Sequence, residues 1–144
     1  MLVTEVSTRQ IGKLLGLKKA VTTLDELEAQ VEAGLPKVAL ESLARHVFGP
    51  GPQATAFVHR VIPSATLHRR SGALKPQESE RVERLARVIA TAEHVWADAD
   101  DARTFLLHPH EVLNGRPPIE VALTELGARR VEQLLWSLFY GLAA

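Results

Sequence analysis

The sequence predicts an all-α protein, a compact array of roughly six to eight helices. Apolar residues recur at spacings of three and four in several segments, and no segment alternates apolar and polar residues as a strand would. Glycine and proline separate these segments. With 144 residues, of which 46% are hydrophobic, the chain has the size of one ordinary domain or of two very small ones that share a core.

Two helices are predicted in the first third of the chain. Thr23-Leu24-Asp25-Glu26 has the spacing of a capping box, so a helix begins there, and Gly34 ends it. Pro36 suits the first turn of a second helix, which runs to about Phe48. Residues 1–21 fit an arm, a dimer contact or a frayed end. Their apolar residues at helical spacing are Ile11, Leu14 and Leu15.

Two short helices are expected after the strongest breaker in the sequence, Gly49-Pro50-Gly51-Pro52. They span about residues 53–61 and 63–70 with almost no connection between them, and Ser71-Gly72 breaks the chain again. This length and order are typical of a helix-turn-helix, in which the second helix enters the major groove of DNA.

One long helix and three shorter ones are predicted in the second half. The long helix runs from Pro76 to Trp96. Asp98 or Asp100 caps the next helix, which ends at His108-Pro109, and Asn114-Gly115 is a turn. Pro118 opens a short helix that Gly127 ends, and the last helix runs to about Gly141. We divide the chain into an arm or short helix at 1–22, a helix-turn-helix region at 23–74 and a second helical region at 75–144.

The formal net charge is zero, but the charges are distributed unevenly. Residues 1–41 hold five bases and six acids, and residues 78–144 hold seven bases and eleven acids. The 36 residues from 42 to 77 hold five bases, three histidines and no acid. Because Lys and Arg side chains that displace counterions supply most non-specific affinity for DNA, this basic segment predicts a phosphate-facing surface. The alternative is a solvated basic face that balances the acidic C-terminal part.

The second short helix of this basic segment is the candidate DNA reader. Ser64 and Thr66 offer short donors and acceptors to bases or phosphates, while Leu67 points into the core. Arg69 and Arg70 bind phosphate or a guanine edge. The predicted DNA-binding residues are Ser64, Thr66, His68, Arg69, Arg70, Arg60 and Lys75. The alternative is a polar surface helix with a basic end.

The residues give little support to other classes of function. The chain has no cysteine, which excludes a disulfide framework, a thiolate metal site and cysteine catalysis. His108-Pro109-His110 has no matching ligand spacing elsewhere, so we predict no metal site. We find no catalytic constellation and no phosphate loop, and therefore expect neither an enzyme nor a cofactor. No apolar run fits a signal peptide or a membrane span, and we expect a cytoplasmic protein that joins the nucleoid when bound to DNA.

Several motifs resemble a known family. In the first half, Ala39 to Ala44, Ile62 to Arg70, Leu74 to Val82 and Arg84 to Arg87 resemble the Xre-type antitoxins of RES-Xre toxin-antitoxin systems. In the second half, Phe105-Leu106, Pro109, Gly115-Arg116-Pro117-Pro118, Glu125-Leu126-Gly127 and Val131-Glu132 resemble the Xre/MbcA/ParS toxin-binding domain. Together these motifs cover about residues 24–142.

The resemblance implies an antitoxin of a type II toxin-antitoxin system with two functions. It would repress its own operon by binding double-stranded promoter DNA. Residues 75–144 would bind and neutralise a RES-domain toxin, an NAD-degrading enzyme encoded next to it. The predicted toxin-binding residues are Arg116, Glu132, Trp136, Phe139 and Tyr140. The three aromatic ones either anchor the partner or close the core.

Operator half-sites about one helical turn apart further predict a homodimer, here within a larger complex with the toxin. If the toxin pocket is cationic for the phosphates of NAD, a carboxylate-bearing C-terminal tail would plug it. Two other functions stay open at this point. One is a stand-alone helix-turn-helix transcriptional regulator without a toxin partner, and the other is a small helical enzyme or ligand-binding module.

Overall fold

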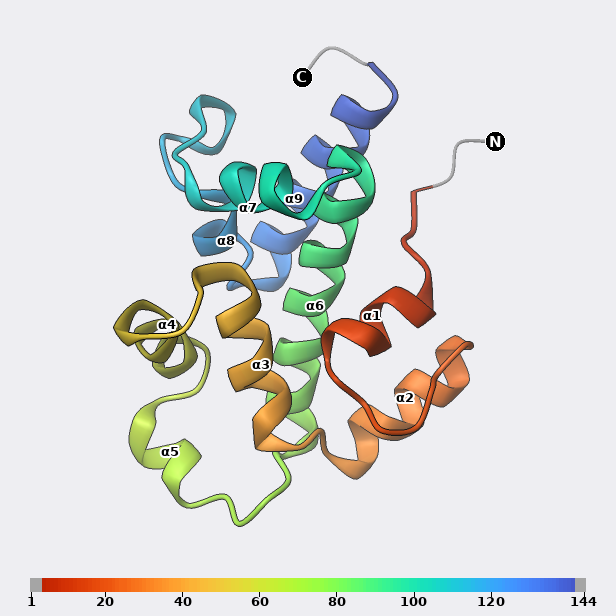
Figure 1. Cartoon of the computed structure of the whole chain (residues 1–144), viewed down its shortest axis with the longest axis vertical. Coiled ribbons are helices and arrows are strands. Elements are labelled where there is room, and N and C mark those ends of the chain that lie inside the picture. Colours follow the sequence, from red (N-terminus) through yellow and green to blue (C-terminus); the bar gives the residue numbers. More distant parts are fainter. Residues whose placement is uncertain (1–3, 142–144) are drawn as a thin grey trace. The chain divides into compact units, whose positions relative to one another are not determined.

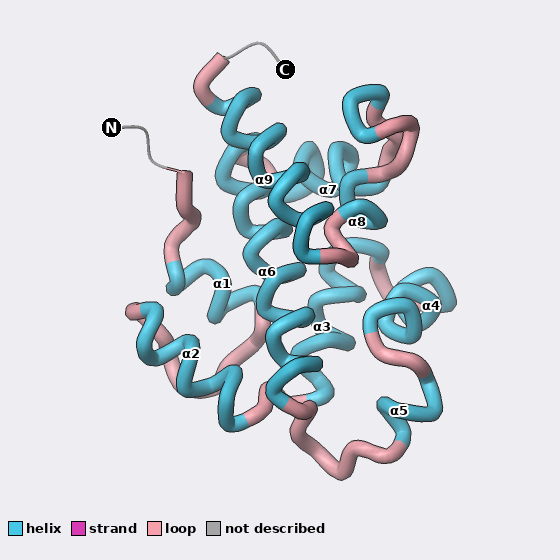
Figure 2. Tube along the Cα trace, turned by 180° about the vertical axis from the view of Figure 1, so that it is seen from behind, coloured by secondary structure: helices cyan, strands magenta, loops and turns pink. Residues whose placement is uncertain are grey.

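The structure is a computed structural model that describes residues 4–141 of the chain (Figure 1). These residues form helices and loops without a strand, as the colours of Figure 2 show, so the all-α prediction is confirmed. The α-helices are α1 (Thr8–Leu14), α2 (Leu24–Ala33), α3 (Lys37–Phe48), α4 (Pro52–Val61), α5 (Ser64–His68), α6 (Pro76–Trp96), α7 (Ala99–Leu107), α8 (Pro118–Val121) and α9 (Glu125–Phe139). A 3₁₀ turn, Glu111–Leu113, lies between α7 and α8.

The described residues group into two compact units. Residues 7–86 form the N-terminal unit, and residues 87–141 together with residues 4–6 form the C-terminal unit. The chain passes from one to the other inside α6, whereas the predicted division near residue 75 lies just before this helix. The outermost residues of the predicted ranges 1–22 and 75–144, and the tail expected to plug a toxin pocket, lie outside the described residues.

The first helix belongs to the core of the N-terminal unit. Ser7 caps α1, and its Oγ accepts a hydrogen bond from the backbone N–H of Gln10 at 3.2 Å. Ile11 and Leu15 are only 3% and 1% exposed. These packed side chains make α1 a part of the core. With α1, the described part of the chain has nine α-helices, one more than the upper end of the predicted range of six to eight.

The predicted capping box at the start of α2 is confirmed. Thr23 Oγ1 accepts the Glu26 N–H at 3.2 Å, and Glu26 Oε1 accepts the Thr23 N–H at 3.2 Å. Glu26 Oε1 also accepts the hydroxyl of Thr22 at 2.9 Å. The bonds from Thr22 and then Thr23 favour the carboxylate and lower the pKa of Glu26. Gly34, with φ of 97°, ends α2 as predicted.

Helices α3 and α4 pack together in the N-terminal unit, and α4 leads directly into α5 (Figure 1). Phe48 at the end of α3 contacts Phe57 of α4, with ring centroids 5.0 Å apart. Pro52 occupies the first turn of α4, where its missing N–H costs no hydrogen bond. The helix predicted at about 63–70 is shorter than expected, since α5 spans only Ser64–His68.

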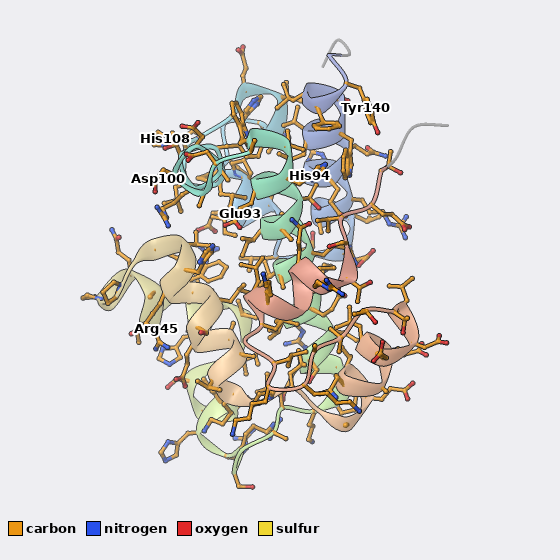
Figure 3. All side chains as sticks on the ribbon, turned by 45° about the vertical axis from the view of Figure 1, so that its right-hand side comes forward. Arg45, Glu93, His94, Asp100, His108 and Tyr140 are labelled. Atoms are coloured by element: carbon orange, nitrogen blue, oxygen red, sulfur yellow. The ribbon has the colours of Figure 1, made fainter. Side chains whose placement is uncertain are left out.

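Local signals also predict the boundaries of α6 and α7. Helix α6 begins at Pro76 and ends at Trp96, as predicted. Asp98 caps α7, its Oδ2 accepting the Asp101 N–H at 2.9 Å, and the helix ends at Leu107 with His108 as its C-cap. Figure 3 labels Asp100 in the first turn of α7 and His108 at its end.

The boundary predicted at Gly127 is wrong. Helix α8 ends at Val121, and Gly127 lies in the first turn of α9, after the N-cap residue Thr124. Thr124 Oγ1 accepts the Gly127 N–H at 3.0 Å. A Cβ atom on Gly127 would overlap with the carbonyl oxygen of Val121. The glycine is therefore needed for the close approach of two helix ends and does not terminate a helix.

Candidate functional site

The predicted DNA-reading residues lie on α4, on α5 and in the segment between α5 and α6. Leu67 is 7% exposed and anchors α5 to the N-terminal unit, as predicted. Ser64 and His68 are exposed, and Thr66 is half-buried. The side chain of Arg69 is exposed, and its Nη2 lies 3.4 Å from Thr66 Oγ1. Ser64, His68 and Arg69, on or next to the short helix, are thus presented to solvent.

Three more bases of the basic segment, residues 42–77, are exposed outside α5. Arg60 lies in the last turn of α4, and Lys75 lies directly before α6. Arg45 is exposed in the last turn of α3 and is labelled in Figure 3. Because residues 42–77 contain no Asp or Glu, no carboxylate of this segment opposes an approaching phosphate.

Arg70 is placed differently from its neighbours. Its Nε donates to Glu78 Oε1 at 2.8 Å, and its Nη2 donates to Glu78 Oε2 at 2.6 Å. The side chains of Arg70 and Glu78 are only 15% and 8% exposed. The hydrogen bonds from Arg70 lower the pKa of Glu78 to about 2, and those to Glu78 raise the pKa of Arg70. The structure thus holds Arg70 in an internal ion pair.

The segment Leu74 to Arg81 ties together several parts of the N-terminal unit. Glu78 Oε1 also accepts the Lys75 N–H at 2.9 Å, at the start of α6. Ser79 is fully buried, and its Oγ accepts the Leu35 N–H at 2.8 Å, in the turn before α3. Arg81 Nη1 donates to the Val61 carbonyl at 3.3 Å, at the end of α4. The side chains of this segment therefore hold together the start of α6, the turn before α3 and the end of α4.

Sequence reasoning missed the ion pair of Arg70, although a signal for it exists. Glu78 is the third residue of a helix that begins with Pro76. At this position a carboxylate reaches the unpaired N–H groups of the helix start, which also carry partial positive charge. An arginine shortly before such a helix is a candidate partner.

Two of the predicted toxin-binding residues are charged and lie in different segments of the C-terminal unit. Arg116 is exposed after the Asn114-Gly115 turn, and its carbonyl accepts the His110 N–H at 3.2 Å. Glu132 of α9 is bound by Arg87 of α6, with Nε to Oε2 at 3.0 Å and Nη2 to Oε1 at 2.9 Å. Their side chains are 32% and 19% exposed, for Arg87 and Glu132 respectively.

The other three predicted residues form an aromatic cluster with His94 at the end of α9. We call Trp136, Phe139, Tyr140 and His94 the aromatic cluster, and Figure 3 labels His94 and Tyr140. Trp136 meets Phe139 edge-on at 5.5 Å and stacks on Tyr140 at 6.1 Å between ring centroids. His94 lies 5.5 Å from Trp136 and 5.1 Å from Phe139.

The members of the aromatic cluster differ in exposure. Trp136 is 6% exposed, and its buried Nε1–H has no acceptor among the described residues, so packing of the rings holds the indole. Phe139 is 44% exposed, and Tyr140 is half-buried. Of the two alternatives for these aromatic residues, Trp136 closes the core of the C-terminal unit, while Phe139 leaves apolar surface open.

Sequence reasoning also missed Arg87 and His94 as partners of α9. These two residues are seven positions apart on α6 and therefore lie on the same helix face. On α9 their partners Glu132, Trp136 and Phe139 are spaced by four and three. The matching spacings are a signal that two helix faces meet.

The described residues offer neither a candidate metal site nor a candidate membrane span. Between residues 4 and 141, no three His, Asp or Glu side chains come together in a way that could hold a metal ion. In the same part of the chain, each helix is too short or too polar to cross a membrane.

Comparison with known families and proteins gives consistent matches. A family model for the antitoxin Xre-like helix-turn-helix domain matches residues 26–87, and one for the antitoxin Xre/MbcA/ParS C-terminal toxin-binding domain matches residues 91–141. A protein named Antitoxin Xre from Yersinia enterocolitica is 30% identical over 138 residues, which cover 93% of this chain and 90% of that protein. An Antitoxin Xre from Pseudomonas putida is 33% identical over 85 residues, covering 57% of this chain and 54% of that protein.

These matches agree with the structure. The helix-turn-helix match ends at Arg87, next to the boundary between the two units, and the second match covers α7 to α9. The chain therefore belongs to the Xre antitoxin family, with an Xre-like helix-turn-helix domain followed by a C-terminal toxin-binding domain.

Proposed function

We propose that this chain is a non-enzymatic antitoxin with two activities. Its C-terminal unit binds and neutralises a RES-domain, NAD-degrading toxin encoded next to it. Its N-terminal unit binds double-stranded DNA at the promoter of its own operon and represses transcription. We place the protein in the cytoplasm, where it joins the nucleoid when it binds DNA.

The observation that carries this proposal is the division of charge between the two units. Residues 7–86 hold 12 bases against 8 acids, whereas residues 4–6 and 87–141 together hold 5 bases against 9 acids. A cationic unit is attracted to the phosphate backbone of DNA, whereas an anionic unit is repelled by it. The charge thus supports a DNA-binding N-terminal unit and a protein-binding C-terminal unit.

Within the N-terminal unit, the exposed residues of the predicted set carry the contact with DNA. Ser64, His68 and Arg69 lie on or next to α5, and Arg60 and Lys75 flank it in sequence. Thr66, a half-buried residue, contributes through its hydroxyl. We assign Arg70 a different role because its guanidinium is bound to Glu78.

Within the C-terminal unit, we propose that Phe139 is the anchor of the toxin interface. Large aromatic side chains supply much of the binding energy of protein interfaces when a partner covers them. Phe139 is 44% exposed and is held by Trp136 and His94, so it reaches the partner already ordered. Tyr140, Glu132 and exposed Arg116 add polar contacts with the toxin in this proposal.

We further propose that the antitoxin acts as a homodimer within a larger complex with the toxin. Helix-turn-helix proteins read two half-sites about one helical turn apart, which requires two copies. The match to an Xre-like helix-turn-helix domain supports this expectation.

A growth experiment tests toxin neutralisation. The neighbouring reading frame is expressed alone and together with the full chain, and the full chain is expected to restore growth. Phe139→Asp should abolish this protection because a charge would have to be buried at the interface. Val38→Asp is the matched control, since Val38 is an exposed apolar residue of α3 in the other unit.

The outcomes separate the candidate functions. Growth arrest that the wild-type chain and Val38→Asp relieve, but Phe139→Asp does not, supports neutralisation through the C-terminal unit. Protection by Phe139→Asp at equal protein level would remove Phe139 from the interface. A neighbour that is harmless without this chain would favour the alternative, a stand-alone helix-turn-helix regulator.

A further inference from the structure

We propose that Arg70 and Glu78 are positioning residues for DNA recognition. Their ion pair fixes the connection between α5 and α6 and thereby the orientation of the side chains that α5 presents to DNA. The proposal rests on the DNA-binding part of the proposed function. It adds a role for two residues that need not touch DNA themselves.

Helix α5 depends on its surroundings for its orientation. It has five residues, and an isolated helix of this length is not stable in water. Leu67 is its single buried residue, so one apolar side chain anchors α5 to the core of the N-terminal unit. A helix held at one point can rotate about it, and further restraint must come from the adjoining chain.

The chain after α5 supplies this restraint at Arg70. The Arg70 N–H donates to the Leu67 carbonyl at 3.1 Å and so closes the last turn of α5. The Arg70 carbonyl accepts a hydrogen bond from Lys37 Nζ of α3 at 3.0 Å. The Arg70 guanidinium is bound through two hydrogen bonds to Glu78 of α6. Backbone and side chain of one residue thus join α5 to two long helices.

Glu78 is itself held in place on its own helix. It accepts the Lys75 N–H at 2.9 Å, and its side chain is 8% exposed. The adjacent Ser79 is buried and bound to the Leu35 N–H at 2.8 Å. A paired guanidinium and carboxylate with two parallel hydrogen bonds restrict direction as well as distance. The ion pair therefore restrains the end of α5 relative to the start of α6, which is itself fixed.

Positioning differs from two simpler roles in what it predicts for DNA affinity. If Glu78 only neutralised Arg70, its removal would free a cation and increase the affinity for every DNA sequence. If the pair only stabilised the fold, its removal would lower the affinity for every sequence. A positioning role predicts a loss that is confined to the specific sequence, because base contacts need a defined orientation and phosphate attraction does not.

The experiment compares two duplexes with the full-length protein. One covers the promoter region upstream of this reading frame, and the other is a shuffled duplex of equal length and composition. Affinities are measured by fluorescence anisotropy at one salt concentration. Glu78→Gln is expected to lower the ratio of specific to non-specific affinity by about tenfold or more, without weakening binding to the shuffled duplex.

Glu80→Gln is the matched control. It removes one carboxylate from the same turn of α6, at an exposed position. The change in net charge equals that of Glu78→Gln, so any general electrostatic effect is shared. The affinity ratio of Glu80→Gln is expected to stay that of the wild type.

A second variant keeps the charge and removes the geometry. Arg70→Lys retains a cation but cannot form two parallel hydrogen bonds with Glu78, and it should lower the affinity ratio as Glu78→Gln does. Circular dichroism checks that each variant keeps its helices. If both variants lose helicity, the pair is required for folding and the positioning proposal is overturned.

The failure of this proposal is distinguishable from that of the proposed function. Wild-type protein that binds neither duplex, or binds both equally, overturns promoter recognition itself. Wild-type protein that prefers the promoter duplex, together with folded variants of Arg70 and Glu78 that keep the same preference, overturns positioning alone. Weaker binding of these variants to both duplexes has the same consequence for positioning.

Discussion

Glu78 illustrates how one side chain serves two needs of the structure. Its carboxylate satisfies a backbone N–H at the start of α6 and binds the guanidinium of Arg70. Both interactions require the ionised form, which is why the pKa of Glu78 falls to about 2. A group whose pKa is lowered in the folded state contributes stability above its unfolded pKa and loses it as the pH falls through the folded value.

This sign gives a prediction for the pH dependence of stability. The free energy of unfolding of the wild type should exceed that of Glu78→Gln by a constant amount above about pH 5. The difference should shrink as the pH falls from about 4.5 towards 2, where Glu78 becomes protonated in the folded state. Urea denaturation at a series of pH values measures it. A difference that did not change over this range would contradict the assignment.

Gly127 is a second residue whose role is set by its neighbours. Gly127→Ala should lower the free energy of unfolding by about 1 to 3 kcal/mol, because the new Cβ would overlap with the Val121 carbonyl oxygen. Chemical denaturation followed by circular dichroism provides the measurement. Gln133→Ala, an exposed change in the same helix, should alter stability by less than about 0.5 kcal/mol. Equal stability of Gly127→Ala and the wild type would show that the helix ends can separate.

At the scale of elements, the predicted boundaries succeed where the signal is local. The capping box of α2, the proline at the start of α6 and the aspartate cap of α7 each lie within a few residues of the helix they begin. The predictions for the end of α8 and for the role of Gly127 were wrong, because both depend on the approach of another chain segment. A glycine looks the same in the sequence whether it ends a helix or permits close packing.

The candidate site shows the same limit. The exposure of Ser64, His68 and Arg69 and the burial of Leu67 follow from helical spacing over a few residues. The ion pair of Arg70 does not, because the acid-free segment ends at residue 77 and Glu78 is the first acid after it. When charges are counted by segment, Arg70 and Glu78 fall on opposite sides of the segment boundary, so the count does not reveal their ion pair.

The cap of α2 allows a test at this scale. Thr23→Ala removes the acceptor of the Glu26 N–H and should cost about 1 kcal/mol of stability. Glu28→Ala is the control, an exposed residue of α2 outside the capping box, with an expected effect below about 0.5 kcal/mol. Thermal or urea denaturation distinguishes the two. A cap variant as stable as the control would mean that packing alone fixes the start of α2.

At the scale of the whole molecule, the two proposed activities are assigned to different units. Arg69→Ala should therefore weaken promoter binding. It should also make the slope of log affinity against log salt less steep, by the contribution of about one phosphate contact. The same variant should still protect cells from the toxin. Titrations of promoter DNA at several salt concentrations, alongside the growth assay, measure both effects.

Arg129→Ala is the control for this experiment. It removes one exposed cation from α9 of the C-terminal unit and changes the net charge by the same amount. Its salt slope should match that of the wild type. If Arg129→Ala reduced the slope as much as Arg69→Ala, net charge rather than a defined surface would govern DNA binding.

The distribution of tryptophan gives this protein a built-in optical probe. Both tryptophans of the chain, Trp96 and Trp136, belong to the C-terminal unit. Intrinsic fluorescence therefore reports on that unit, while far-ultraviolet circular dichroism reports on the helices of both. Denaturation curves that coincide for the two signals would show that the units unfold as one cooperative block. DNA that binds only the N-terminal unit should likewise leave the emission of these two tryptophans unchanged when it is added to the unlabelled protein.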